Sequence, residues 1–253
     1  MFCRFLFVLF LSLSGIFCFG QQLHIKYFHV RSPIATLYED LYVNGSEVML
    51  VQDSLISFNS AGSNDISAIR KNKTVNKNYF ISKIPQADND AERNFFFTGN
   101  IEDQGFFVHD RIEKPKWAIE YNKTKKILGY ECIKATTTFR GTRLTAYYAK
   151  DLKYSIGPFK FFGLPGIILD IREDNNSFNI WKAEKIEFVE NLNVNFNPSF
   201  SERQKITLKQ FVKFKEGVLE KETVDFKKSL PVGVSVISQK RFGIEKKYEW
   251  EEG

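Results

Sequence analysis

The chain has 253 residues, a formal net charge of +6 and 43% hydrophobic residues. It is too apolar for a disordered chain and too long for a small scaffold held by disulfides. It contains 26 Phe and 10 Tyr, and aromatic side chains suit the half-buried faces of strands. These numbers favour a globular β-rich protein and exclude collagen-like and low-complexity classes.

Residues 1–20 have the layout of a secretory signal peptide. Arg4 supplies a positive charge, an apolar stretch follows, and Cys18 and Gly20 are small residues at a cleavage site. As a helix the apolar stretch spans roughly 22 Å, short of the hydrocarbon core of a bilayer, which is about 30 Å thick. We predict cleavage after Gly20, with a membrane anchor or a lipid on Cys18 as the alternatives. Residues 21–253 then form a single exported domain without a transmembrane span.

Alternating apolar and polar residues predict strands along most of the chain up to residue 190. Short turns separate these strands, which favours antiparallel pairing. Asn44-Gly45 predicts a type I′ hairpin turn, residues 122–124 predict another turn, and residues 59–78 predict a long loop. The expected strands are 23–27, 36–42, 48–51, 79–81, 95–97, 106–108, 117–121, 127–139, 144–148, 167–171 and 178–188.

The pattern changes after Pro198. Thr207 and Gln210 have the spacing of a capping box, and apolar residues recur at helical spacing beyond them. This predicts one amphipathic helix near 207–222, followed by a plausible strand at 234–237. The predicted fold class is mainly β, a curved antiparallel sheet or half-barrel with a C-terminal amphipathic helix packed on or beside the sheet.

Few residues point to catalysis or metal binding. His24 and His29 are five apart on a strand, which puts them on opposite faces and disfavours a shared metal ion. His109 is the third histidine, and nothing local marks a serine activated for catalysis by Ser, His and Asp. The carboxylate pairs 102–103 and 173–174 lie in predicted turns, which favours solvated side chains over glycoside-hydrolysing acids. Cys132 in an alternating run predicts a buried, inert thiol. We therefore predict no catalytic residue, no metal site and no cofactor.

The segment 157–169 differs from the rest of the chain in its Gly, Pro and Phe content. Pro165 and Gly166 fit a type II turn with positive φ at Gly166, and Gly163 would let another backbone approach. The segment is either a tight corner before a central strand or the rim of an apolar cavity, and replacing Lys160 is expected to leave folding nearly unchanged. The candidate binding residues are Gly157, Pro158, Phe159, Phe161, Phe162, Gly163, Leu164, Pro165 and Gly166.

The run 163–168, with the sequence GLPGII, resembles the signature of the GLPGLI family, exported envelope proteins of Gram-negative bacteria. The upstream run 128–135 is similar to a strand of the same family. The resemblance implies a β-rich fold and a location in the periplasm or outer envelope. It implies no activity and no catalytic residues.

Three functions stay open from the sequence. The first is a non-enzymatic envelope protein that binds a hydrophobic ligand, a lipid or a protein partner. The second is a structural partner of an outer-membrane or secretion component, and the third is a hydrolase. Acidic residues interleave with the basic ones, which disfavours nucleic acid as a partner. The sequence does not determine the oligomeric state.

Overall fold

The structure, a computed structural model, describes residues 22–33, 35–53, 57–58, 77–85, 91–231, 241 and 243–251. The predicted signal peptide, the strand predicted at 234–237 and most of the loop predicted at 59–78 lie outside the described residues. The strands are β1 (Gln22–Ser32), β2 (Ala35–Asn44), β3 (Glu47–Gln52), β4 (Ser57–Phe58), β5 (Asn78–Lys83), β6 (Glu92–Ile101), β7 (Gln104–Glu113), β8 (Ala118–Ile127), β9 (Tyr130–Phe139), β10 (Thr142–Ala149), β11 (Ile167–Glu173), β12 (Ile180–Val189) and β13 (Gln204–Thr207). The described helices are α1 (Leu208–Lys228) and the short 3₁₀ helix η2 (Glu249–Glu251).

The described strands form one sheet, in the order β13-β7-β6-β5-β3-β2-β1-β12-β11-β10-β9-β8, with β4 paired to β2. Most neighbours in this order are also neighbours in the chain, as short turns predict. The pairing of β1 with β12 joins the two halves of the chain into a continuous sheet. Pairing is antiparallel throughout this path except between β13 and β7, which are parallel. The predicted mainly β fold with a C-terminal helix is confirmed, and the sheet is mixed rather than purely antiparallel.

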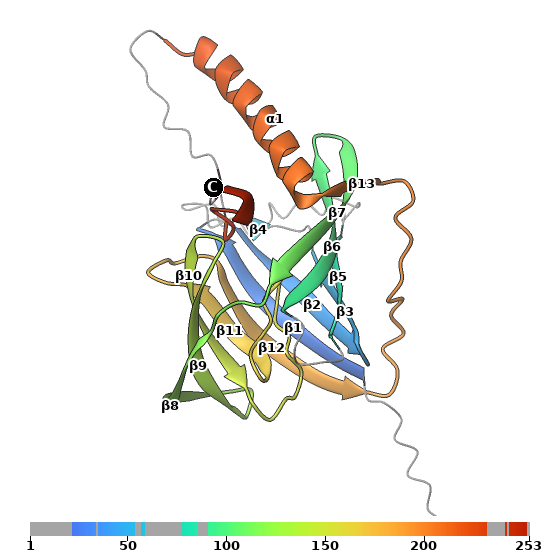
Figure 1. Cartoon of the computed structure of the whole chain (residues 1–253), viewed down its shortest axis with the longest axis vertical. Coiled ribbons are helices and arrows are strands. Elements are labelled where there is room, and N and C mark those ends of the chain that lie inside the picture. Colours follow the sequence, from blue (N-terminus) through green and yellow to red (C-terminus); the bar gives the residue numbers. More distant parts are fainter. Residues whose placement is uncertain are drawn as a thin grey trace, which may run out of the picture.

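The sheet coils so strongly that distant strands face each other (Figure 1). Asp110 on β7 lies near one end of the sheet, and Arg140 follows β9 near the other end. Their side chains nevertheless form an ion pair with a distance of 2.7 Å between Arg140 Nη2 and Asp110 Oδ1. The concave side is therefore enclosed, and its inward-facing residues form the core.

The segment between β10 and β11 fills part of this concave side. Phe161 packs against Trp181 of β12 and Phe139 of β9, and Phe162 packs against Phe95 of β6. Because these three strands belong to different parts of the sheet, the segment holds the coiled sheet together from inside. It is a core element with few backbone pairs of its own, which explains why strand periodicity is absent from its sequence.

Two turns differ from the prediction. The β2–β3 turn uses Gly45 and Ser46, with positive φ at Gly45 but not at Asn44. The predicted turn at 122–124 is wrong, because β8 continues through it with an irregular register and turns at 128–129. The sequence could not show that the strand continues, because a β-bulge accommodates extra residues without ending the strand.

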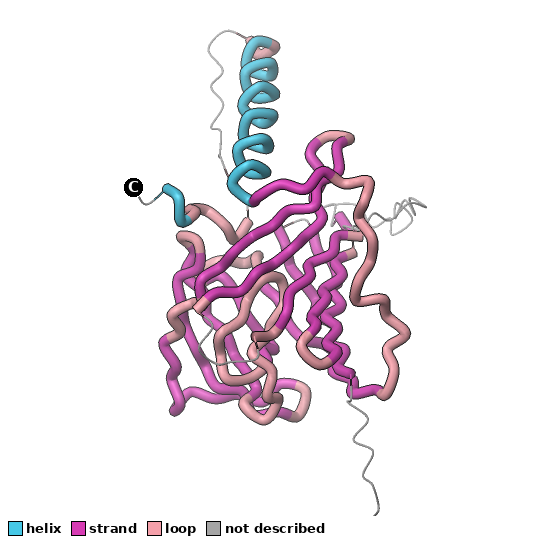
Figure 2. The backbone as a smooth tube through the Cα atoms, turned by 45° about the vertical axis from the view of Figure 1, so that its right-hand side comes forward, coloured by secondary structure: helices cyan, strands magenta, loops and turns pink. Residues whose placement is uncertain are grey.

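Helix α1 begins as its sequence predicts. The Thr207 side chain accepts a hydrogen bond from the backbone of Gln210, and the Gln210 side chain accepts one from the Thr207 backbone. The helix is longer than predicted, and its buried residues are confined to Leu208, Phe211 and Val212 at its start. Figures 1 and 2 show it rising from one rim of the sheet, so only its beginning packs beside the sheet.

We expect Thr207→Ala to lower the free energy of unfolding by about 1 kcal/mol, because the cap hydroxyl satisfies a backbone N–H that the first turn leaves free. Urea denaturation followed by circular dichroism measures the change. Ser201→Ala, an exposed hydroxyl in the preceding loop, is the matched control and should leave the midpoint unchanged. An equal effect in both variants would contradict the capping role.

Candidate functional site

A cleft of about 520 Å³ opens at the rim of the sheet from which α1 rises. The ends of β1, β3, β5, β6 and β12 form its floor, the first half of α1 forms one wall, and Arg241 with residues 243–248 forms another. The lining mixes aromatic rings with amide, basic and acidic side chains. Its main members are His29, Arg31, Gln52, Asn78, Phe80, Phe97, Asn100, Phe159, Lys160, Trp181, Phe211, Lys215, Glu216, Leu219, Arg241, Glu245 and Tyr248.

The cleft side of α1 is a single stripe of the helix. Leu208, Phe211, Val212, Lys215, Glu216 and Leu219 follow the three- and four-residue spacing that places side chains on one face. Near the sheet this stripe is apolar and packs on Phe97 and Phe106 through Phe211. One turn further on it becomes charged, so the helix supplies both the anchor and the polar wall of the cleft.

Glu39 is a fully buried carboxylate beneath the cleft. It faces inward because it lies on the same face of β2 as the buried Leu37 and Leu41, two residues away on either side. Its oxygens accept hydrogen bonds from Gln52 Nε2 at 2.8 Å, Trp181 Nε1 at 2.9 Å and the backbone N–H of Phe159 at 3.3 Å. Burial alone would raise the pKa of Glu39, but His29 and these donors outweigh it and lower the pKa. The carboxylate is therefore held ionised inside the protein.

His29 lies between Glu39 and the cleft. Its Nδ1 atom is 2.9 Å from Oε1 of Glu39, and its ring stacks on Trp181 with 4.0 Å between ring centroids. The side chain is almost fully buried, yet neither ring nitrogen has an aligned hydrogen-bond partner within the described part of the chain. A buried nitrogen without a partner is costly, and here the histidine lines an open cleft. A group bound in the cleft would satisfy it.

The wall formed by Arg241 and residues 243–248 is fastened by a buried ionic cluster. Asp110 lies between Arg140 and Lys160, with 2.7 Å to each cation, and Lys160 also reaches Glu245 at 3.0 Å. Arg140 forms a further ion pair with Glu245. The hydroxyl of Thr142 donates to the backbone carbonyl of Ile244 at 2.7 Å. These contacts fix the C-terminal wall against the β9–β10 turn.

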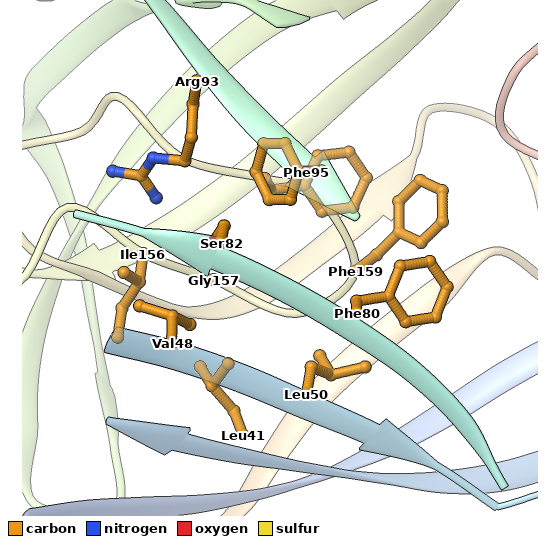
Figure 3. A pocket seen from close by; sticks show the side chains of 11 residues that line it. Leu41, Val48, Leu50, Phe80, Ser82, Arg93, Phe95, Ile156, Gly157 and Phe159 are labelled. Atoms are coloured by element: carbon orange, nitrogen blue, oxygen red, sulfur yellow. The ribbon is translucent and has the colours of Figure 1, made fainter. Parts of the chain in front are cut away.

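The structure places the candidate residues of the 157–169 segment mostly below the cleft. Phe159 lines it, whereas Phe161, Phe162 and Leu164 are buried in the core. Gly157, Phe159 and Phe161 also line a separate cavity of about 10 Å³ over the inner side of β2, β3 and β5, and Figure 3 shows the side chains that line it. Whether any of the nine residues binds a ligand stays a prediction. Lys160, expected to be dispensable for folding, is buried in the ionic cluster.

The predicted roles of the two glycines in this segment are exchanged. Gly163, not Gly166, has a positive φ, of +96°. Gly166 instead lies against the backbone of β10, where a Cβ atom would be 2.2 Å from the carbonyl oxygen of Ala149. The expected type II turn with positive φ at Gly166 is therefore wrong. The reason is that close packing, which local sequence does not reveal, decides the residue at this position.

The other candidate residues are dispersed. His24 and His29 lie on opposite faces of β1, as predicted, and His24 is held on the outer face by Asp40 and Glu187. His109 contacts Asn94 on the exposed face of β7. Among the described residues no group of three His, Cys, Asp or Glu is placed to hold a metal ion. Cys132 is buried, and burial raises its pKa to about 11, which makes the thiol inert as predicted.

Sequence reasoning missed Glu39 and Asp110, the buried carboxylates that organise the site. Each has a recognisable signal. Glu39 lies between Leu37 and Leu41, and Asp110 between Val108 and Ile112, so each acid occupies an inward position of an apolar alternation. Charged residues are almost never fully buried unless paired, and such a position predicts a buried polar network.

Comparison with known proteins now identifies the family. Residues 44–210 match the family described as "N-glycanase peptide, N-terminal domain". The chain belongs to this family. Most strand residues of the cleft floor, including Gln52, Asn78, Phe97 and Trp181, lie inside the matched range.

Similar solved structures include two crystal forms of PNGF-II. The C2 form is 18% identical, with a TM-score of 0.49, and the match covers 74% of this chain and 31% of that chain. The P21 form is 17% identical, with a TM-score of 0.49, and covers 76% and 32%. The present chain thus spans about a third of the length of PNGF-II. An uncharacterised conserved protein from Thermus thermophilus is 6% identical, with a TM-score of 0.40 and coverage of 74% and 90%. No curated protein matches the chain.

These findings correct two predictions. The GLPGLI family assignment is wrong, because the family match runs over more than half of the chain whereas the resemblance rests on short glycine-containing runs. The presence of glycine at 163 follows from a positive φ, and at 166 from close packing against the backbone of β10. Local requirements of this kind do not define a family. The expectation of a non-enzymatic binding protein is also unsupported, since the matching family is described as the N-terminal domain of an N-glycanase. The Gram-negative envelope location came from the same resemblance. No helix among the described residues is long and apolar enough to cross a membrane.

Proposed function

We propose that this chain acts in the hydrolytic removal of N-linked glycans and that the cleft beside α1 receives the glycan. The observation that carries the proposal is the coincidence of the family match, residues 44–210, with the floor of the cleft. Export through the predicted signal peptide would bring the chain to extracytoplasmic glycoproteins. The proposed ligand is thus a glycan, which has both polar and apolar faces, rather than the hydrophobic ligand expected from the sequence.

The lining supports a carbohydrate ligand. Sugars present apolar C–H faces and many hydroxyl groups, and the cleft offers aromatic rings beside amide side chains such as Asn78 and Asn100. Its volume of about 520 Å³ falls within the range of about 300–1,000 Å³ that is usual for ligand pockets. The floor is preformed, because the sheet and the buried Glu39 network fix it.

Hydrolysis also needs a group that accepts a proton from water. His29 is the proposed general base, with Glu39 as the residue that positions its ring. The unpartnered Nε2 atom is the one available for this role. A carboxylate beside one ring nitrogen leaves the other to work on the substrate, as in other histidine-dependent hydrolases.

The test uses the purified chain with a denatured glycoprotein and with a fluorescent N-glycopeptide. We expect glycan release with conversion of the linked Asn to Asp, followed by mass spectrometry, and glycopeptide binding measured by fluorescence anisotropy. Leu219→Trp, which places an indole in the cleft, should abolish both. Val224→Trp introduces the same side chain on the exposed part of α1 and is the control that should change neither.

His29→Gln separates binding from catalysis. We expect this variant to bind the glycopeptide but to release no glycan, with its thermal unfolding midpoint measured to establish that it is folded. Binding by the wild-type chain without any release would contradict the catalytic role of His29. The absence of both binding and release would contradict the proposed function as a whole.

A further inference from the structure

The charges of the cleft are not balanced. Four Lys or Arg side chains and two Glu side chains line it. Lys160 is paired with Asp110 and Glu245, and Arg241 is paired with Glu216 and Glu251, at 2.6 Å to each. Both cleft glutamates are therefore already engaged with a cation.

Arg31 and Lys215 are the cations that remain. Neither forms an ion pair with a carboxylate in the part of the chain that the structure describes. Arg31 follows His29 by two residues, at the point where the register between β1 and β2 shifts, and both side chains line the cleft. Lys215 lies one turn beyond Phe211 on the cleft stripe of α1. The two cations thus reach one cleft from two separate elements.

The proximity of Arg31 and Lys215 has an electrostatic cost. Burial lowers the pKa of Lys215, the positive charge of Arg31 lowers it further, and Glu245 partly opposes both. Like charges that line one cleft repel each other, and an anion placed between them removes this repulsion. A protein that holds two such cations at the mouth of a ligand cleft is suited to a negatively charged ligand.

We propose that the cleft takes a glycan that carries an acidic group and that Arg31 and Lys215 bind this group. This inference rests on the proposed function, because the rest of the cleft would hold the neutral sugars. The Arg31 guanidinium can donate two parallel hydrogen bonds to a carboxylate or a sulfate, and Lys215 adds a second positive charge. His29, two residues before Arg31 on β1, lines the same cleft.

The experiment measures binding of three fluorescent glycopeptides to the full chain. One carries terminal sialic acid, the second is the same glycopeptide after sialidase treatment, and the third carries a sulfate ester in place of sialic acid. We expect the acidic forms to bind about tenfold more tightly than the neutral form at low salt, with the difference shrinking at about 0.5 M NaCl. Preference for the sialylated form over the sulfated form identifies a carboxylate-bearing sugar, and the reverse order identifies a sulfate ester.

The variant Arg31→Gln/Lys215→Gln should lose the preference for acidic glycans while binding the neutral glycopeptide as before. Lys213→Gln/Lys221→Gln removes two charges from the other side of α1 and should keep the preference. Arg31→Lys should keep part of it, because it retains the charge without the planar donor pair.

Equal affinity for acidic and neutral glycopeptides would overturn the inference and leave the proposed function standing. Persistence of the preference in the Arg31→Gln/Lys215→Gln variant would overturn it as well. Binding of free sialic acid or sulfate without any contribution from the glycan would retain the anion site and contradict the proposed function. No binding of any probe would contradict both.

Discussion

Gly166→Val is expected to prevent folding or to lower the free energy of unfolding by more than about 3 kcal/mol. A Cβ atom at this position would lie 2.2 Å from the carbonyl oxygen and 2.8 Å from the carbonyl carbon of Ala149. These are backbone atoms of β10, and Ala149 is paired with Cys132 on one side and Ile167 on the other. The strand cannot move aside without breaking the ladder.

Urea denaturation measures the effect, and Gly166→Ala is the milder companion if the Val variant does not accumulate. Gly217→Ala is the matched control. Gly217 lies in the exposed part of α1, where an added Cβ atom would have no neighbouring atom within 4 Å, and we expect the change to stabilise the protein by about 0.5–1 kcal/mol. An unchanged midpoint in Gly166→Ala would contradict the close approach of the two backbones.

Asp110→Asn is expected to lower the free energy of unfolding by about 3–5 kcal/mol. The side chains of Asp110, Arg140 and Lys160 are each no more than 2% exposed. Removing the central negative charge leaves two buried cations with Glu245 and Glu249, which are more exposed to solvent than Asp110. Chemical denaturation gives the change. Asp225→Asn breaks an exposed ion pair with Lys228 and should cost no more than about 0.5 kcal/mol.

The combination Asp110→Asn/Lys160→Met removes one of the stranded cations together with the acid. It should recover part of the lost stability, because fewer buried charges are left without a partner. If the double variant were less stable than Asp110→Asn alone, Lys160 would not owe its burial to Asp110.

The same carboxyl gives the stability a pH dependence. Burial by itself raises the pKa of Asp110, but Lys160 and Arg140 outweigh it and hold the pKa below its ordinary value of 3.8. The folded-state pKa is therefore lower than that of the unfolded chain, so the ionised carboxyl stabilises the fold above pH 3.8. As the pH falls below 3.8 towards the folded-state pKa, this stabilisation is lost. Asp110→Asn should show a smaller loss over that range.

The sequence predicted the parts of the fold that local patterns control. Alternation located most strands, and Thr207 with Gln210 located the start of α1, because pleating and capping act over two to four residues. It did not predict that β13 pairs with β7 in parallel or that residues 150–166 fill the concave side. Both depend on contacts between distant segments, which leave no periodic trace.

The candidate site was predicted least well. Phe159 was the one proposed binding residue that lines the cleft. Lys160 carries a charge and lies between two Phe, so exposure was the natural expectation, and only the position of Asp110 in space explains its burial. The cleft residues come from β1, β3, β5, β6, β12, the segment between β10 and β11, α1 and the C-terminal segment. No local motif can mark a site that is assembled from so many separate elements.

The fastening of the C-terminal wall has a consequence for the order of folding. Thr142 and Ile244 are 102 positions apart, and Arg140 and Glu249 are 109 apart, whereas most strand pairs join neighbours in the chain. Contacts of such separation pay a larger loop-closure entropy and form after the local hairpins. The β1–β12 pairing joins residues that are still further apart in the chain. The hairpins therefore form first, and the cleft is completed only when both β12 and the C-terminal wall have docked.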